Sequence, residues 1–287
     1  MLKNKYAVFT MDVESFTDTE CVAKSKNTVN VDLLDGFDEY IKILDEHNIK
    51  CTMFTVGSLA PKMTDKLKSC INNGHELALH NYEHVAPNEI EPEIFKDKLL
   101  KSKSKLSEMF KTEVVGFRAP FFGIDKQHLE IIKEAGFKYD SSFLDFSAAS
   151  HNVKFSLDDF KKISKDIYKK ENFFEFGIPK RKMFGFNFPI SGGGYVRLNY
   201  WPYIKNLIKQ YLEENDYYVF YLHPFELTTQ KIPDLKDLKL HDKYYLNHGI
   251  KSYADHIRQL ISILKSLGYT FITFNELANK LNEQKEV

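Results

Sequence analysis

Two short stretches of the sequence carry side chains that can bind and use a metal ion. His80 and His84 lie four residues apart in the stretch His-Asn-Tyr-Glu-His, directly after an apolar run. Asp12 and Glu14 follow another apolar run in the same way. Two imidazoles and one carboxylate can bind a catalytic divalent cation and leave a position open for water. The second carboxylate would then be free to act as a base.

An arginine and a third histidine stand at similar points of the chain. Arg118 ends an apolar run and precedes Ala-Pro-Phe-Phe, where the proline fixes a turn, so its guanidinium could hold a carboxylate through two hydrogen bonds. His223 ends another apolar run and precedes a proline, a position that suits a general acid. Taken alone, each of these motifs also fits a structural role, such as a capping histidine, a helix cap or a salt bridge at a barrel rim.

The elements that must position these residues alternate along the chain. Apolar runs rich in β-forming residues predict strands at 6–11, 50–56, 75–80, 114–118, 173–176, 217–222 and 269–273. Amphipathic stretches predict helices at 33–47, 60–73, 92–110, 126–135, 201–214, 253–267 and 274–283, with Gly74, Gly136 and Gly268 just past three of them. This alternation predicts an α/β protein whose parallel sheet is closed, or nearly closed, into a barrel. The candidate residues then share the carboxyl ends of the strands, which is the catalytic face of a β/α barrel.

No composition shift divides the chain, so residues 1–287 are expected to form a single domain. The alternation is interrupted at about 144–198, which we interpret as an excursion from the barrel. Within it, Ser-Gly-Gly-Gly-Tyr at 191–195 indicates a flexible loop or a close backbone approach. It does not indicate a phosphate-binding loop, because no Lys-Ser/Thr follows the glycines. Tyr195 is a candidate for contact with a substrate.

The composition restricts the classes of partner and compartment. Lys and Arg balance Asp and Glu at 40 each, so no net field favours nucleic acid or an anionic membrane. Cys21, Cys51 and Cys70 lack metal-ligand spacing and suggest a reducing compartment. With no signal-peptide pattern and no apolar run of membrane-spanning length, we expect a cytoplasmic protein without integral membrane contact.

In combination, the four motifs are far more specific than each is alone. Asp-x-Glu, His-x-x-x-His, Arg-x-Pro-Phe and Leu-His-Pro, in this order, resemble the polysaccharide deacetylase family (carbohydrate esterase family 4, with the NodB-type domain) from about Tyr6 to Leu277. The resemblance implies a deformed (β/α)7-type barrel that removes acetyl groups from N-acetyl sugars with one divalent metal. Zinc is expected first, although two histidines and one carboxylate also suit cobalt, nickel, iron or manganese. Asp-Val-Glu, Arg-Ala-Pro and the glycine-rich stretch are most similar to deacetylases of bacterial surface-polysaccharide pathways.

The resemblance also implies a role for each matching residue. The general base would be Asp12, the metal ligands Glu14, His80 and His84, the residue that orients the base Arg118, and the general acid His223. The backbone N–H of Phe121 would help to stabilise the oxyanion, and Leu222 would help to line the pocket for the acetyl methyl group.

The sequence departs from the family pattern in three places. The first motif of the family usually has two aspartates, commonly adjacent, whereas Asp12 and Glu14 are separated by one valine. This leaves open which carboxylate is the base and which is the ligand. The aromatic residue of Arg-x-Pro-x is Phe121 rather than the more usual tyrosine. The acidic motif that tunes the general acid is not evident, and Asp140, in Tyr-Asp-Ser-Ser, is the candidate for it.

The predicted function is hydrolysis of an N-acetyl group from an amino sugar or saccharide of a bacterial surface polysaccharide or its precursor, with release of acetate. The expected partner is a small saccharide or a saccharide-linked substrate. One alternative is an amidohydrolase of the same fold that acts on a non-sugar amide or a cyclic amide. Another is a non-catalytic carbohydrate-binding relative, but a binding module needs no general acid, so the full set of residues argues against it.

Overall fold

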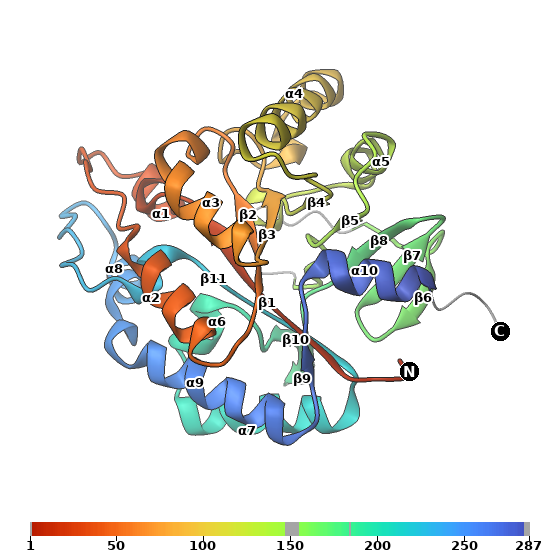
Figure 1. The fold of residues 1–287 in the computed structure, drawn as a ribbon. Coiled ribbons are helices and arrows are strands. Elements are labelled where there is room, and N and C mark those ends of the chain that lie inside the picture. Colours follow the sequence, from red (N-terminus) through yellow and green to blue (C-terminus); the bar gives the residue numbers. More distant parts are fainter. Residues whose placement is uncertain (1, 147–154, 184, 284–287) are drawn as a thin grey trace.

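A curled, mostly parallel sheet forms the centre of the molecule (Figure 1). The computed structural model describes residues 2–146, 155–183 and 185–283. The main strand order is β11-β1-β2-β3-β4-β5-β8-β7-β6, and β12 pairs with β1. The parallel strands are β1 (Tyr6–Val13), β2 (Cys51–Thr55), β3 (Glu76–Leu79), β4 (Gly116–Phe117), β5 (Tyr139–Asp140), β8 (Phe173–Phe176), β11 (Tyr217–Leu222) and β12 (Thr270–Phe271). Within the described ranges no ladder joins β11 to β8, so the barrel is open between them.

The central strands are mostly apolar because both faces of the sheet are covered. All residues of β1, β2 and β11 are buried. The register places Met11 of β1 beside Leu222 of β11, and Asp12 beside Phe54 of β2. The carboxyl ends of these strands are therefore level, and the residues that follow them meet on one face.

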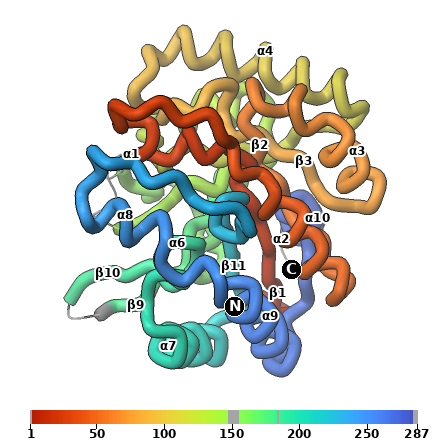
Figure 2. The backbone as a smooth tube through the Cα atoms, turned by 90° about the vertical axis from the view of Figure 1, so that its left-hand side faces the viewer, coloured from red at the N-terminus to blue at the C-terminus, as the bar shows by residue number. Residues whose placement is uncertain are grey.

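Amphipathic helices cover the outside of the sheet (Figures 1 and 2). They are α2 (Asp35–Asp45), α3 (Thr64–Asn72), α4 (Pro92–Phe110), α5 (Lys126–Glu134), α7 (Trp201–Glu214) and α9 (Ile250–Ser266). In contrast, α10 (Phe274–Glu283) packs against the other face of the sheet, in the cluster that contains Tyr6, Val8 and Phe54. Gly74, Gly136 and Gly268 have φ angles of 90°, 74° and 77°, which confirms their predicted role in ending helices in the left-handed region. None of the helices in the described part of the chain is both long and apolar enough to cross a membrane.

The α/β barrel and its seven predicted strands are confirmed, with ends that differ by up to about two residues, as is usual for such boundaries. The sequence did not predict β5, which has only two residues. It also missed the strands of the excursion, β6 (Lys161–Ser164), β7 (Ile167–Lys170), β9 (Lys180–Met183) and β10 (Phe186–Pro189). Four of the eight residues of β6 and β7 are lysines, so these strands lack an apolar pattern. Parts of the predicted excursion, residues 147–154 and 184, lie outside the described residues.

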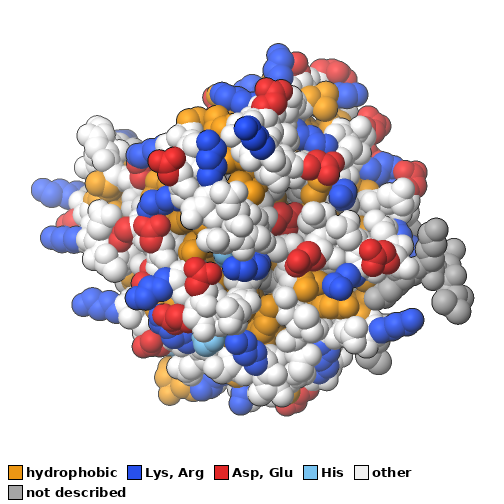
Figure 3. Space-filling view, in the orientation of Figure 1, with side chains coloured by type: hydrophobic (Ala, Val, Ile, Leu, Met, Phe, Trp, Pro, Cys, Tyr) orange, Lys and Arg blue, Asp and Glu red, His pale blue; other side chains and the backbone are white. Residues whose placement is uncertain are grey.

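Three short helices lie near the carboxyl ends of the strands: α1 (Glu20–Ala23), α6 (Gly193–Arg197) and α8 (Leu240–Asn247). In Figure 2, α1 and α8 stand on the same side of the molecule as the β9–β10 hairpin. The face seen in Figure 3 mixes basic and acidic side chains, in keeping with the balance of charges in the sequence.

Candidate active site

Three potential metal ligands come together after β1 and β3. Glu14 Oε2 lies 2.7 Å from His84 Nε2 and 3.6 Å from His80 Nε2. One ligand atom from each residue fits within 4.8 Å of the others. All three side chains are buried, at 6% exposure or less. The sequence predicted this set, and the structure brings it together.

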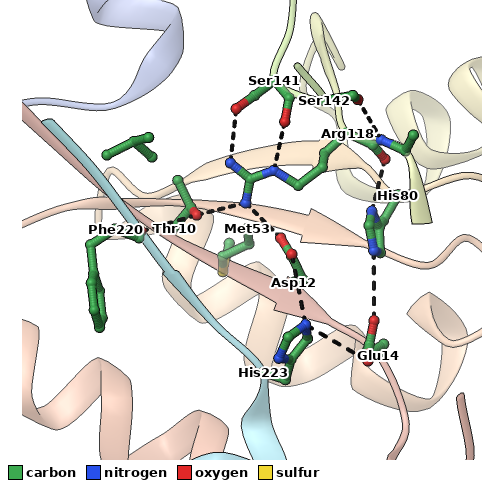
Figure 4. Close-up of polar contacts among 12 residues, drawn as sticks. Thr10, Asp12, Glu14, Met53, His80, Arg118, Ser141, Ser142, Phe220 and His223 are labelled. Carbon is green, nitrogen blue, oxygen red and sulfur yellow. Dashed lines mark hydrogen bonds and ion pairs between the residues drawn. The ribbon is translucent and has the colours of Figure 1, made fainter. Parts of the chain in front are cut away.

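The hydrogen bonds around these residues suit a metal site. His80 Nδ1 donates to the backbone carbonyl of Arg118 over 2.8 Å, which turns Nε2 toward Glu14 (Figure 4). Metal-binding histidines are commonly oriented by such an outer contact. His84 directs its buried Nε2 at Glu14 Oε2, 2.7 Å away, so this ring nitrogen is placed to bind a cation beside the carboxylate. The donor set therefore fits a divalent cation.

The electrostatics of the cluster favour an ionised Glu14. Burial opposes its charge, but the charges of His84 and His223 and hydrogen bonds with both His80 and His84 hold its pKa well below the usual range. Burial acts against the charged form of His84 as well, yet Glu14 raises the pKa of that imidazole. The site thus keeps an anionic carboxylate among imidazoles, and this charge distribution would attract a cation.

Arg118 holds the second carboxylate, Asp12. Both side chains are buried, and Arg118 Nη1 donates to Asp12 Oδ1 over 2.8 Å. The same nitrogen donates to Thr10 Oγ1, while Nε and Nη2 donate to the carbonyl and hydroxyl of Ser141 (Figure 4). The predicted two-bond contact is therefore wrong, since the guanidinium gives Asp12 one bond. Asp12 Oδ2 is left facing His223 Nε2 at 4.0 Å.

His223 lies between the two acids and a third carboxylate, Glu226. Its Nε2 is 4.0 Å from Glu14 Oε1, and its Nδ1 is 3.1 Å from Glu226 Oε2. Burial lowers the pKa of His223, but Glu14, the hydrogen bond and charge of Glu226, and Asp12 raise it to about 9. Glu226 is fully buried and accepts a 2.9 Å bond from Arg197 Nε. The imidazole is therefore held protonated, with its Nε2 toward the pocket.

Glu226 is a site residue that the sequence analysis missed. The contact that was assigned to Asp140, tuning of His223, is made by Glu226, whereas Asp140 lies on β5 and accepts bonds from Ser142. The spacing in the sequence could have indicated that Glu226 contacts His223. Glu226 is the third residue after His223, and its carboxylate caps the turn Pro224–Leu227 as in a helix capping box.

The glycine-rich stretch makes room for this arrangement. A Cβ at Gly192 would lie 2.0 Å from the ring of Tyr221, and one at Gly193 would lie 1.6 Å from Glu226 Oε2. Of the two predictions for this stretch, the close backbone approach agrees with the structure. Gly193 begins α6, which ends at Arg197, so the same short helix admits and binds Glu226.

Of the three residues predicted to contact the substrate, Phe121, Leu222 and Tyr195, only Phe121 lines the pocket. Phe121 lines the pocket, and its ring packs edge-on to His84 with centroids 4.5 Å apart. Leu222 is fully buried in the core, whereas its neighbour Tyr221 lines the pocket. Tyr195 packs against the rings of Phe146 and Phe188, and burial raises its pKa to about 12.

A pocket of about 360 Å³ opens over these groups. Its inner wall holds the ionisable residues Asp12, Glu14, His80, His84 and His223, together with the apolar residues Ala119, Phe121, Phe122 and Tyr221. Its outer wall comes from the region of α1 and from α8, through Thr19, Glu20, Cys21, His241, Asp242 and Tyr245. The pocket can therefore present a water molecule and an acyl group to two carboxylates and a protonated imidazole.

Comparison with known proteins supports a polysaccharide deacetylase domain in this chain. Residues 28–139 match the family model of the polysaccharide deacetylases, and residues 149–278 match a domain of unknown function (DUF3473). A peptidoglycan deacetylase-like protein of Gibberella zeae is 32% identical over 37% of this chain and 32% of its own length. A peptidoglycan deacetylase of Helicobacter pylori is 26% identical over 38% of this chain and 37% of its own length. The chain thus matches only about a third of the length of these relatives.

Solved structures share the fold over almost the whole chain. A candidate polysaccharide deacetylase from Mycobacterium smegmatis aligns with a TM-score of 0.64 at 18% identity, over 100% of this chain and 94% of the other. The Puue allantoinase aligns with a TM-score of 0.63 at 12% identity, over 98% and 91%. A carbohydrate esterase family 4 pseudoenzyme from Bacillus anthracis aligns with a TM-score of 0.55 at 13% identity, over 96% and 66%. At these identities the likeness concerns the fold alone.

Proposed function

We propose that the chain is a metal-dependent N-deacetylase that acts on an amino sugar or saccharide of a bacterial surface polysaccharide or its precursor and releases acetate. One observation carries the proposal. A single pocket contains three buried metal-type ligands, a carboxylate held by Arg118, and a histidine held protonated by Glu226. The family match of residues 28–139 supports a deacetylase of the polysaccharide or peptidoglycan type.

Glu14, His80 and His84 would hold one divalent cation, with zinc expected first. When bound, the cation would supply Lewis acidity, which polarises an amide carbonyl and lowers the pKa of water. The buried side chains and the outer contact of His80 would fix the orientation of the ligands.

The chain's own groups divide the proton transfers between them. Arg118 binds Asp12 Oδ1 and leaves Oδ2 facing the pocket, so Asp12 would accept the proton of the attacking water. His223 would donate the proton on Nε2 to the leaving amine, while Glu226 holds its Nδ1. We assign the backbone N–H of Phe121 as a donor to the oxyanion. The C–N bond breaks, and the products are acetate and a free amine.

The test begins with the metal and then measures the reaction. We would strip the protein, reload it with zinc and measure metal content by elemental analysis beside a His80→Ala/His84→Ala double variant. His241→Ala is the matched control, because His241 lines the same pocket but is 73% exposed and outside the ligand set. We expect about one zinc per chain in the wild type and the control, and loss of it in the double variant. Equal metal content in all three proteins would contradict the proposal.

Acetate release from N-acetylglucosamine oligomers by the zinc-loaded protein then tests the chemistry. Hydrolysis of allantoin or another cyclic amide, without acetate release from the sugars, would instead support an amidohydrolase with the same site. Zinc binding without hydrolysis of any of these compounds would support a non-catalytic relative.

A further inference from the structure

Two acidic side chains lie next to each other on neighbouring strands of the sheet, near the segment that contains Arg118. Asp140 on β5 and Glu175 on β8 are direct partners in the parallel register. Both residues are fully buried. Two neighbouring carboxylates that are both shielded from solvent repel each other strongly when both are ionised. The pair is therefore expected to hold a proton.

The hydrogen bonds show which oxygen is available to carry that proton. Glu175 Oε1 accepts from the backbone N–H groups of Ser142 (3.1 Å) and Phe143 (2.9 Å). Both oxygens of Asp140 accept from Ser142, Oδ2 from its N–H (2.9 Å) and Oδ1 from its hydroxyl (2.8 Å). Glu175 Oε2 is buried and finds no other partner in the described part of the chain, but the Glu175 side chain hydrogen-bonds to Asp140.

A proton on Glu175 Oε2 would give this buried oxygen a hydrogen bond to Asp140 and remove the repulsion between the two carboxylates. As a carboxylic acid, Glu175 would donate to the Asp140 carboxylate, and such charge-assisted bonds are strong. As a carboxylate, it would leave a buried oxygen unsatisfied beside another anion. In agreement, burial and the charge of Asp140 raise the pKa of Glu175 well above its usual range.

The acid pair is linked through Ser142 to the segment that begins at Arg118. Because the Ser142 hydroxyl donates to Asp140, its lone pair is directed to the backbone N–H of Ala119, 2.8 Å away. The preceding residue, Ser141, accepts two bonds from the Arg118 side chain. Figure 4 shows Ser141 and Ser142 on one side of Arg118 and Asp12 on the other.

The segment that follows needs such an anchor. Phe121 and Phe122 have φ angles of 56° and 55°, a left-handed conformation that costs energy for residues other than glycine and persists only where the surroundings impose it. This turn places the Phe121 ring against His84. The carbonyl of Arg118, at the start of the turn, also orients His80.

We propose that Asp140 and Glu175 share one proton as a carboxylate–carboxylic acid pair and, through Ser142, position the turn at residues 118–122 against the metal ligands and the pocket. This role rests on the deacetylase function proposed above. The two acids are positioning residues, because they act through Ser142 and do not contact the pocket.

The test compares three variants, which change in turn the proposed donor Glu175, the acceptor Asp140 and the bridging hydroxyl of Ser142. In Glu175→Gln the amide N–H₂ replaces the O–H donor to Asp140, so we expect wild-type kcat. In Asp140→Asn an amide nitrogen would face only the hydrogen-bond donors that now bind the Asp140 carboxylate. We therefore expect kcat to fall ~10–100-fold, as for other contacts that orient metal ligands. KM and zinc content should not change. Ser142→Ala removes only the bridging hydroxyl, and we expect a smaller loss of kcat with little change in unfolding temperature.

Asp216→Asn is the matched control, since Asp216 is a buried carboxylate just before the amino end of β11, and we expect it to retain wild-type kcat. Two outcomes would overturn the proposal. Wild-type kcat in Asp140→Asn or Ser142→Ala would show that the turn does not depend on the pair. A loss in Glu175→Gln as large as in Asp140→Asn would show that Glu175 is not the proton donor.

An infrared measurement keeps this inference separate from the proposed function. The wild-type minus Glu175→Gln difference spectrum at pH 7, recorded on metal-free protein, should contain the C=O band of a neutral carboxyl group. Absence of that band would overturn the shared proton whether or not the protein is a deacetylase. If the band is present but the wild type releases no acetate, the proton pair stands and the deacetylase proposal fails.

Discussion

Two buried arginines hold two buried carboxylates on either side of His223, and the comparison shows how similar ion pairs can serve different roles. Arg118 donates to Asp12 over 2.8 Å, and Arg197 donates to Glu226 over 2.9 Å. Both arginines are fully buried. In each pair the arginine stabilises the charge that burial would otherwise make expensive.

The pairs differ in what the second carboxylate oxygen faces. Asp12 Oδ2 faces the pocket, 4.0 Å from His223 Nε2. Glu226 Oε2 is occupied by the N–H and Nδ1 of His223, and Gly193 packs against it. Asp12 can therefore exchange a proton with a substrate or water, whereas Glu226 can act only through His223. Substitution of the first pair should change the chemistry most, and substitution of the second should change the state of the histidine.

The largest effect is expected for Asp12→Asn. The amide oxygen can still accept the bond from Arg118, but the side chain can no longer take a proton. We expect kcat to fall by ~10⁴-fold, at the upper end of the range for a general base, with one zinc per chain retained. Steady-state kinetics with elemental analysis measures both. If the variant keeps most of its activity, Glu14 and not Asp12 would be the general base. Asp12 would then not differ from Glu226 in its ability to exchange protons with the substrate or water.

A smaller loss is expected for His223→Ala. It removes the proposed general acid but leaves both arginine–carboxylate pairs and the proposed metal ligands, so kcat should fall ~10²–10⁴-fold. The measurement is acetate release at pH 7 beside the wild type. Partial recovery with added imidazole would support a proton-transfer role. An unchanged rate would exclude His223 from the mechanism.

Glu226→Gln should change the pH profile as well as the rate. Because Glu226 stabilises the imidazolium, its removal lowers the pKa of His223 from about 9. The alkaline limb of kcat should then move to lower pH, and kcat at pH 7 should fall ~10-fold. Comparison of metal-loaded wild type and variant between pH 5 and 10 measures the shift. An alkaline limb at the same pH in both proteins would break the proposed link between Glu226 and His223.

The same variant makes a prediction for stability, with a defined sign. The folded-state pKa of His223, about 9, is raised above the ordinary value of about 6.5. The stability that this contributes is fully present below about pH 6.5 and is lost as the pH rises through about 9. The difference in unfolding free energy between wild type and Glu226→Gln should therefore be larger at pH 6 than at pH 10, as urea titrations can show.

The comparison also shows what the sequence could predict. Asp12, His80, Arg118 and His223 each follow or end a strongly apolar strand, and the carboxyl ends of parallel strands meet on one face. Local patterns were therefore sufficient to place them together. Arg197 and Glu226 lie 29 residues apart, and Arg197 comes from a short glycine-rich helix without an apolar pattern. Only the tertiary packing of α6 on the turn after β11 brings the two side chains together.

Asp140 is a residue whose partner the local sequence pattern could not predict. Its site role was predicted from the stretch Tyr-Asp-Ser-Ser alone, but β5 has only two residues and its partner β8 lies within the irregular excursion. The pairing of β5 with β8 directs Asp140 to Glu175 rather than to His223. That register depends on a long-range contact that no local spacing in the sequence specifies.

The smallest effect is expected for Gly193→Ala, which tests how closely the second pair is enclosed. The added Cβ would lie 1.6 Å from Glu226 Oε2, so the carboxylate must move away from Arg197 and His223. We expect a loss of about 1–3 kcal/mol in unfolding free energy, as for other overpacked sites. The alkaline limb should shift in the same direction as in Glu226→Gln, by a smaller amount.

Gly194→Ala is the matched control for this substitution. Its Cβ would lie 3.0 Å from the ring edge of Tyr245 and 4.0 Å from Leu198 Cδ1, and these side chains can adjust at lower cost than a buried ion pair. We expect Gly194→Ala to retain the wild-type pH profile. Equal profiles for the two alanine variants would show that Glu226 tolerates displacement. The close packing around the Arg197–Glu226 pair would then not be what confines this carboxylate to His223.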